Sequence, residues 1–227
     1  QVLYANTTGT NNVGMGGSDG NGTAPALRYN TTGSCNTAIG SAALASNTTA
    51  GYNTAVGSQA LYSANRTADA NGYNTALGYQ AGYSNQTGIG LNLIGYRAGY
   101  SSTNGYLTAI GYQAINASAT GILNTAVGYA ALTALTSGQS NTAFGQASLI
   151  AVTTGSNNVG VGQGTVAAVT TASDNDRAVL ATSGVTVDLG DAATMAAGYR
   201  VTIKNNASSG TVTVGRANAS NKIDRVA

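Results

Sequence analysis

The sequence lacks most of the side chains on which enzymes depend. It contains no His, no Trp and no Glu, one Cys and one Pro, and only 7% of its residues are charged. Catalytic triads and most zinc sites need His or several Cys, and acid–base pairs need two convergent carboxylates. Because the few Asp are scattered along the chain, we expect no enzyme activity, no catalytic residue, no metal site and no cofactor.

Charge and long apolar runs are also scarce. The formal net charge is +2, and the Lys and Arg residues do not cluster, so we expect no nucleic-acid partner. Apolar runs are only a few residues long, which predicts no membrane insertion of this segment. Cys35 is alone and cannot form an intrachain disulfide. Hydrophobic residues still make up 42% of the chain, which argues against disorder.

A short repeat fills most of the chain. Aligning it on one glycine gives nine stations, at positions 16, 40, 57, 78, 95, 111, 128, 145 and 162, whose separations are 24, 17, 21, 17, 16, 17, 17 and 17 residues. Gly and β-branched residues oppose a helical repeat, and 17 residues are too few for a helical hairpin of about 34. We therefore predict an all-β, parallel β-roll or β-solenoid with one coil per unit and about nine coils.

Three kinds of residue recur at fixed places in the repeat. We expect the glycines to lie at tight turns or close contacts: they are Gly40, Gly57, Gly78, Gly95, Gly111, Gly128 and Gly145. Asparagines should stack as an amide ladder along the shaft: they are Asn36, Asn53, Asn74, Asn124 and Asn141. A column of phenols is expected from Tyr79, Tyr96, Tyr112 and Tyr129. It would bind sugars through aromatic faces or serve only as a stabilising ladder.

The pattern within each strand suggests which side faces inward. In Asn-Thr-Ala-Val-Gly, Thr and Val share one parity, and Asn, Ala and Gly share the other. We expect Thr and Val to fill the inside of the coil. The small residues would then lie against neighbouring chains, which points to an oligomer whose isolated monomer is not a stable fold.

The repeat resembles known fibrous proteins. The unit Asn-[Ser/Thr]-x-Ala-[Ile/Val]-Gly, followed by a second Ala-rich strand, resembles the head repeats of trimeric autotransporter adhesins. The form Asn-Thr-Ala-Val-Gly-Tyr-x-Ala-Leu, as at residues 124–132, is more similar to repeats of bacteriophage tail fibres. The resemblance covers residues 11–166 and implies a left-handed β-roll of three chains.

The composition changes near residue 167. Residues 167–227 hold eleven of the sixteen charged side chains. We predict a shaft over residues 1–166, a linker over 167–176, and a small antiparallel β module over 177–227, because residues 185–189, 199–204 and 211–214 alternate apolar and polar side chains. The chain stops at Ala227 without a clear terminal element, which leaves open a further domain beyond it.

Together these features predict a structural fibre that supports host-cell attachment. The first hypothesis is a bacteriophage tail fibre segment in the virion, and the alternative is a bacterial surface adhesin of the trimeric autotransporter class. An ice-binding solenoid would need an exposed Thr array, and the expected inward position of Thr disfavours it. We expect this chain to bind itself and a cell-surface glycan or protein receptor. The main receptor contacts should lie after residue 167, with the Tyr column as the competing site.

Overall fold

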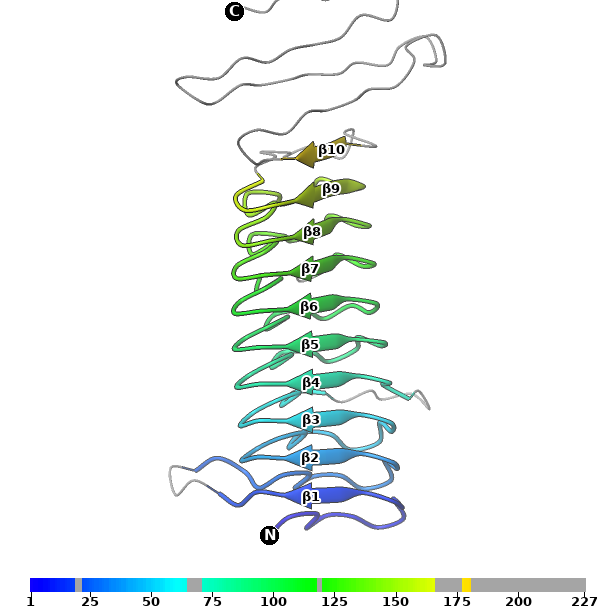
Figure 1. Cartoon of the computed structure of the whole chain (residues 1–227). Coiled ribbons are helices and arrows are strands. Elements are labelled where there is room, and N and C mark those ends of the chain that lie inside the picture. The colour runs from blue at the N-terminus through cyan, green and yellow to red at the C-terminus, as the bar shows by residue number, and fades with distance from the viewer. Residues whose placement is uncertain (19–21, 65–70, 118–119, 166–176, 181–227) are drawn as a thin grey trace, which may run out of the picture. The chain divides into compact units, whose positions relative to one another are not determined.

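The computed structural model describes residues 1–18, 22–64, 71–117, 120–165 and 177–180, and no helix occurs within these ranges. The strands are β1 (Val13–Met15), β2 (Thr37–Ile39), β3 (Thr54–Val56), β4 (Thr75–Leu77), β5 (Asn92–Ile94), β6 (Thr108–Ile110), β7 (Thr125–Val127), β8 (Thr142–Phe144), β9 (Asn158–Val161) and β10 (Arg177–Leu180). They form one parallel sheet in the order β1 to β10, stacked along one axis (Figure 1). The prediction of an all-β parallel solenoid is confirmed.

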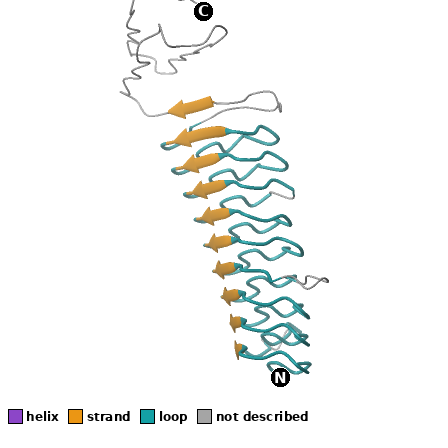
Figure 2. Cartoon of the chain, turned by 90° about the vertical axis from the view of Figure 1, so that its right-hand side faces the viewer, coloured by secondary structure: helices purple, strands orange, loops and turns teal. Residues whose placement is uncertain are grey.

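Equivalent residues of successive coils pair with each other. Thr54 pairs with Thr75 and Ala126 with Ala143, and each of β1 to β9 ends one residue before one of the nine repeat glycines. The two longer intervals, before Gly40 and before Gly78, do not disturb this register. The strands line one side of the solenoid, and the loops close the coil on the other sides (Figure 2).

The corners of the coil lie at positive φ, and most of them are not glycine. Three columns of ordinary residues adopt the left-handed conformation, represented in one coil by Gln113 (φ 53°), Ile115 (φ 50°) and Leu123 (φ 58°). This conformation costs a non-glycine residue about 1–2 kcal/mol. Hydrogen bonds to the adjoining coil hold the corners in place: the backbone N–H of Gln113 donates to Tyr96 O, and that of Ile115 to Ala131 O.

The repeat glycines occupy a fourth corner with more extreme geometry. Gly111 has φ +133°, a region open to glycine almost alone. A Cβ atom built there would overlap the carbonyl oxygen of Gly128 in the next coil. This corner therefore excludes a side chain both by its torsion angle and by the close approach of two backbones.

The strand alanines fill the inside of the coil, so the expected orientation of the strands is wrong. Ala38, Ala55, Ala76, Ala109, Ala126 and Ala143 are all fully buried within a single chain. Their inner neighbours include leucines from the opposite turn, such as Leu61 and Leu132, which are also fully buried. Since these leucines occupy the interior, only a methyl group fits on the strand side, and Thr and Val point outward.

One coil departs from this packing and compensates for it. The inward residue of β5 is Leu93 instead of Ala, and it is fully buried. The opposing leucine is replaced by glycine in two successive coils, at Gly82 and Gly99. A Cβ atom at Gly82 would lie 2.8 Å from Leu93 Cδ1, and one at Gly99 2.6 Å from Leu93 Cδ2. Leu93 thus occupies the volume that the two glycines leave.

The sheet continues to the last described residues. β10 pairs in parallel with β9, in the register Arg177 to Asn158 and Leu180 to Val161. The linker predicted over residues 167–176 and the three strands predicted within 185–214 lie outside the described residues. The domain boundaries and the antiparallel module stay predictions.

Candidate functional site

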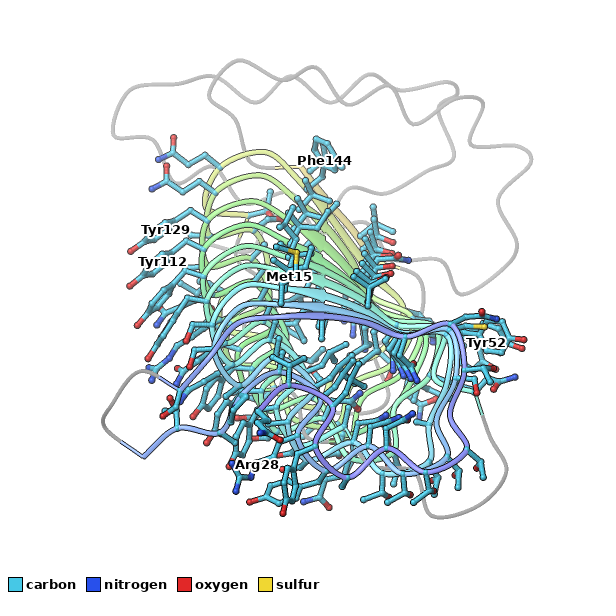
Figure 3. The ribbon with its side chains drawn as sticks, turned by 90° about the horizontal axis from the view of Figure 1, so that it is seen from below. Met15, Arg28, Tyr52, Tyr112, Tyr129 and Phe144 are labelled. Carbon is cyan, nitrogen blue, oxygen red and sulfur yellow. The ribbon has the colours of Figure 1, made fainter. Side chains whose placement is uncertain are left out.

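The outer face of the strands is an apolar surface without charge. Two rows of side chains run along it, one mainly of Thr and one of large aliphatic and aromatic residues. In the second row Met15 is 61% exposed, Leu77 47% and Phe144 56%. The outward row also contains Ile39, Val56, Ile94, Ile110, Val127 and Val161. Met15, in the first strand, and Phe144, in the eighth, project from the same side of the solenoid (Figure 3).

The predicted asparagine ladder lies inside the coil next to this face. Asn141 Nδ2 donates to Asn124 Oδ1 at 3.0 Å, and the backbone N–H of Asn158 donates to Asn141 Oδ1 at 2.9 Å. The same contacts join Asn36 to Asn53, and the backbone N–H of Asn74 donates to Asn53 Oδ1. Leucines at 91 and 107 interrupt the ladder in the middle of the shaft. These amides bond to their own chain and offer no binding surface.

A second asparagine column was not predicted. Asn30 Nδ2 donates to Asn6 Oδ1, and Asn47 Nδ2 donates to Asn30 Oδ1, both at 2.8 Å. Asn30 and Asn47 are fully buried, so the Asn-x-Thr sequences that they begin are not accessible for glycosylation in the folded chain. The signal for this column was present in the sequence, because the two residues are one coil length of 17 residues apart.

The four predicted tyrosines form a continuous outward stack. Ring centroids are 5.6 Å apart between Tyr79 and Tyr96, 4.8 Å between Tyr96 and Tyr112, and 5.1 Å between Tyr112 and Tyr129, with interplanar angles of 15° or less. Tyr112 and Tyr129 project away from the coil with the hydroxyls at their tips (Figure 3). Rings stacked this closely cover one another's faces. The column therefore presents edges and hydroxyl groups, and open faces only at its two ends.

A second tyrosine column, formed by Tyr62, Tyr83 and Tyr100, follows the first at a fixed interval. Its ring centroids are 5.0 and 5.2 Å apart, with interplanar angles of 7° and 5°. Burial is the main cause that raises the pKa of Tyr83, followed by the charges of Tyr62, Tyr100 and Tyr79. This column could have been predicted from the sequence, because Tyr83 follows Tyr79 by four residues and Tyr100 follows Tyr96 by the same interval.

A row of polar side chains runs beside the first column and consists of Gln59, Gln80, Arg97 and Gln113, and Ala130 ends it in the next coil. Gln80 Nε2 donates to Gln59 Oε1 at 2.6 Å, and Arg97 Nε donates to Gln80 Oε1 at 2.8 Å. The guanidinium carbon of Arg97 lies 5.5 Å from the ring centroid of Tyr96 and 4.8 Å from that of Tyr100. Arg97 therefore contacts both tyrosine columns and is fixed by a glutamine that is 8% exposed. Arg97 was not among the predicted site residues.

Within the described ranges, no group of His, Cys, Asp or Glu side chains is placed to hold a metal ion. Nor does that part of the chain contain a helix long and apolar enough to cross a membrane. Comparison with protein family models, with curated proteins and with solved structures finds no match for this chain. Function is therefore inferred from the chain's own geometry.

Proposed function

We propose that this chain is a segment of a structural fibre that supports attachment to a host cell, in the manner of a bacteriophage tail fibre, and that it assembles as a homotrimer. The supporting observation is the uncharged apolar row on the outer strand face. Large contiguous apolar surfaces are rare on monomeric proteins and usually mark contacts with other molecules. Because this row runs through nine coils, the contact extends along the shaft.

The partner that suits this face best is another copy of the same chain. The row repeats once per coil, so a partner matches it along its length only if it has the same repeat. A second and a third copy meet this condition, and their own rows of Val, Ile, Leu and Phe would be buried in return. Burial of apolar surface contributes about 25 cal/mol for each Å² removed from water. The number three is taken from the resemblance to trimeric fibres.

Charged substitutions on the outer face test the assembly. Leu77 and Ile94 lie on adjacent coils and are exposed in the single chain, so Leu77→Lys with Ile94→Lys should leave the interior of the coil intact. Gln86→Lys with Gln139→Lys adds the same charge at exposed positions away from the strands and is the matched control.

Sedimentation equilibrium gives the readout. We expect the wild-type chain and the control to have three times the mass of 22.3 kDa for one chain. The outer-face variant should be a monomer, because burying an unpaired ammonium in an apolar interface is costly. A wild-type chain that is monomeric and folded at micromolar concentration would show that the apolar row is not an assembly surface.

A second candidate function, ice binding, gains support from the corrected orientation of the strands. Thr54, Thr75 and Thr142 are exposed and lie in one outward row, whereas the sequence analysis placed this row inside. The neighbouring row is aliphatic, and Asn92 interrupts the threonines. A measurement of thermal hysteresis separates the two functions: the fibre proposal expects none, for the wild-type chain and for a Thr75→Lys variant alike.

A further inference from the structure

Arg97 carries a positive charge that no described side chain neutralises. No Asp or Glu occurs among the described residues. Arg97 is half-buried, and its Nε is engaged by Gln80. Rings of Tyr96 and Tyr100 lie close to its guanidinium group. A cation held in this way, beside low-polarity rings, attracts an anion more strongly than a mobile surface arginine does.

The two tyrosine columns on either side of Arg97 add neutral polar groups to this surface. Tyr79, Tyr96 and Tyr112 present their edges along one column, and Tyr83 and Tyr100 along the other. Each phenol can both donate and accept a hydrogen bond. Because the columns run along the shaft axis, the hydroxyl groups recur once per coil. A ligand that satisfies them must be elongated and must carry many hydroxyl groups.

We propose that the surface formed by the two tyrosine columns and Arg97 binds an acidic polysaccharide, laid along the shaft, with a carboxylate of one sugar on the guanidinium of Arg97. Hydroxyl groups of the sugars exchange hydrogen bonds with the phenols of the tyrosine columns. The site requires neither the trimer nor the C-terminal residues. It therefore goes beyond the proposed function, and it differs from the expectation that the main receptor contacts lie after residue 167.

The spacing of charge favours a polysaccharide over a nucleic acid. A nucleic acid carries one phosphate per nucleotide, and its binding proteins neutralise many of them with Lys and Arg. Between Tyr62 and Tyr129 the described residues of these two columns supply one cation, Arg97, among seven tyrosines. A sugar polymer with an occasional carboxylate and many hydroxyl groups matches that ratio.

The experiment uses the full chain and a defined pair of ligands. The first is a hyaluronate oligosaccharide, in which only every second sugar carries a carboxylate, and the second is the same oligosaccharide after reduction of its carboxylates to hydroxymethyl groups. Arg97→Gln removes the charge but keeps a side chain that the neighbouring coils carry at 80 and 113, so the fold should be retained. Arg28→Gln is the matched control, because Arg28 also lies against tyrosines, Tyr4 and Tyr29.

Calorimetry at low and at physiological salt measures the affinities. We expect the acidic ligand to bind the wild-type chain and Arg28→Gln alike, and to bind Arg97→Gln at least about tenfold more weakly, as loss of a charged hydrogen bond implies. The reduced ligand should lose affinity for the wild-type chain by a similar factor. Higher salt should lower the affinity of the wild-type chain for the acidic ligand but not for the reduced one.

Three results would overturn the proposal. The first is equal binding of both ligands to the wild-type chain, which tests the charge without any substitution. The second is equal weakening by Arg28→Gln and Arg97→Gln. The third is no binding of the acidic ligand at millimolar concentration, or binding of a DNA duplex in its place.

Discussion

The packing around Leu93 yields a quantitative prediction about the core. Leu93 is the large inward residue of β5, and it occupies the volume left by Gly82 and Gly99. Replacing it by Ala restores the residue that most other strands carry but leaves the two glycines unfilled. We expect Leu93→Ala to lower the free energy of unfolding by about 2–5 kcal/mol, the range for buried Leu→Ala changes. We expect a loss in the upper half of this range, because neither glycine has a side chain that can move into the cavity.

The same geometry predicts a rescue. Adding Gly82→Leu and Gly99→Leu to Leu93→Ala recreates the arrangement of the neighbouring coils, in which Leu61 and Leu132 oppose strand alanines. The left-handed backbone is no obstacle, because Leu61 (φ 50°) and Leu132 (φ 51°) already adopt it and Gly99 has φ 60°. The triple variant should recover part of the lost stability, because a Cβ atom at Gly82 would also lie 2.9 Å from Leu61 Cδ2, which has to turn aside. The two Gly→Leu changes alone should destabilise, because their Cβ atoms would approach Leu93 within 2.8 and 2.6 Å.

Urea unfolding of the four proteins at one fixed protomer concentration completes the cycle, since association would make stability depend on concentration. Strong non-additivity between Leu93 and the glycine pair is the expected outcome. If the effects simply add, or if Leu93→Ala costs less than about 1 kcal/mol, then Leu93 does not fill the space of the glycines and the account of the core is wrong.

Three further predictions concern the ladders and corners. Gly111→Val should lower the free energy of unfolding by about 2 kcal/mol or more, because the new side chain would overlap the backbone of Gly128 in the next coil. An unchanged melting temperature would show that this corner can adapt to a side chain. Asn141→Ala should cost about 1–3 kcal/mol, because the buried Asn158 loses its acceptor; hydrogen exchange should show faster exchange of the Asn158 amide, and unchanged exchange would contradict the ladder. The pKa of Tyr83 is raised in the folded chain, so its contribution to stability is full below pH about 10 and falls as pH rises through the folded-state pKa. Tyr83→Phe should therefore reduce the loss of stability at alkaline pH. Denaturant titrations of the wild-type chain and the variant at several pH values measure this loss, and an unaltered dependence of stability on pH would assign it to other tyrosines.

The period of the sequence was sufficient to predict the coil. A glycine every 17 residues, with Asn four positions before it in most units, requires a structure in which equivalent positions meet. Gly111 contacting Gly128, and Asn124 bonding Asn141, are the direct result. The number of chains and the handedness had no such signal and came only from the resemblance.

The direction of the strands could not be predicted from alternation alone. Ala and Val are both apolar, so the pattern Thr-Ala-Val does not say which parity faces the core. The answer depends on the width of the coil, which is set by what the opposite turn contributes. That turn places Leu61 and Leu132 inside through left-handed backbone, a conformation that the propensities of leucine disfavour. The inward Ala follows from the turn and not from the strand.

The second tyrosine column and Arg97 were missed for a simpler reason. Tyr83 and Tyr100 lie four residues after Tyr79 and Tyr96, but only Tyr62 continues this column to an adjoining coil, whereas Ala45 and Asn116 occupy its place further along. Arg97 stands alone where the neighbouring coils have Gln80 and Gln113. A departure from a repeat has no periodic signal, and its meaning becomes visible only when its neighbours are placed around it.

The matching of equivalent positions has a consequence for how such a shaft changes over generations. The side chains above and below any residue come from the same place in the adjoining coils. Loss or duplication of one whole unit in the gene, such as residues 112–128, would therefore join coils whose ladders and columns already agree. Unequal recombination between the repeats can lengthen or shorten the solenoid in steps of about 4.8 Å, and no new interface has to arise for the altered solenoid to fold.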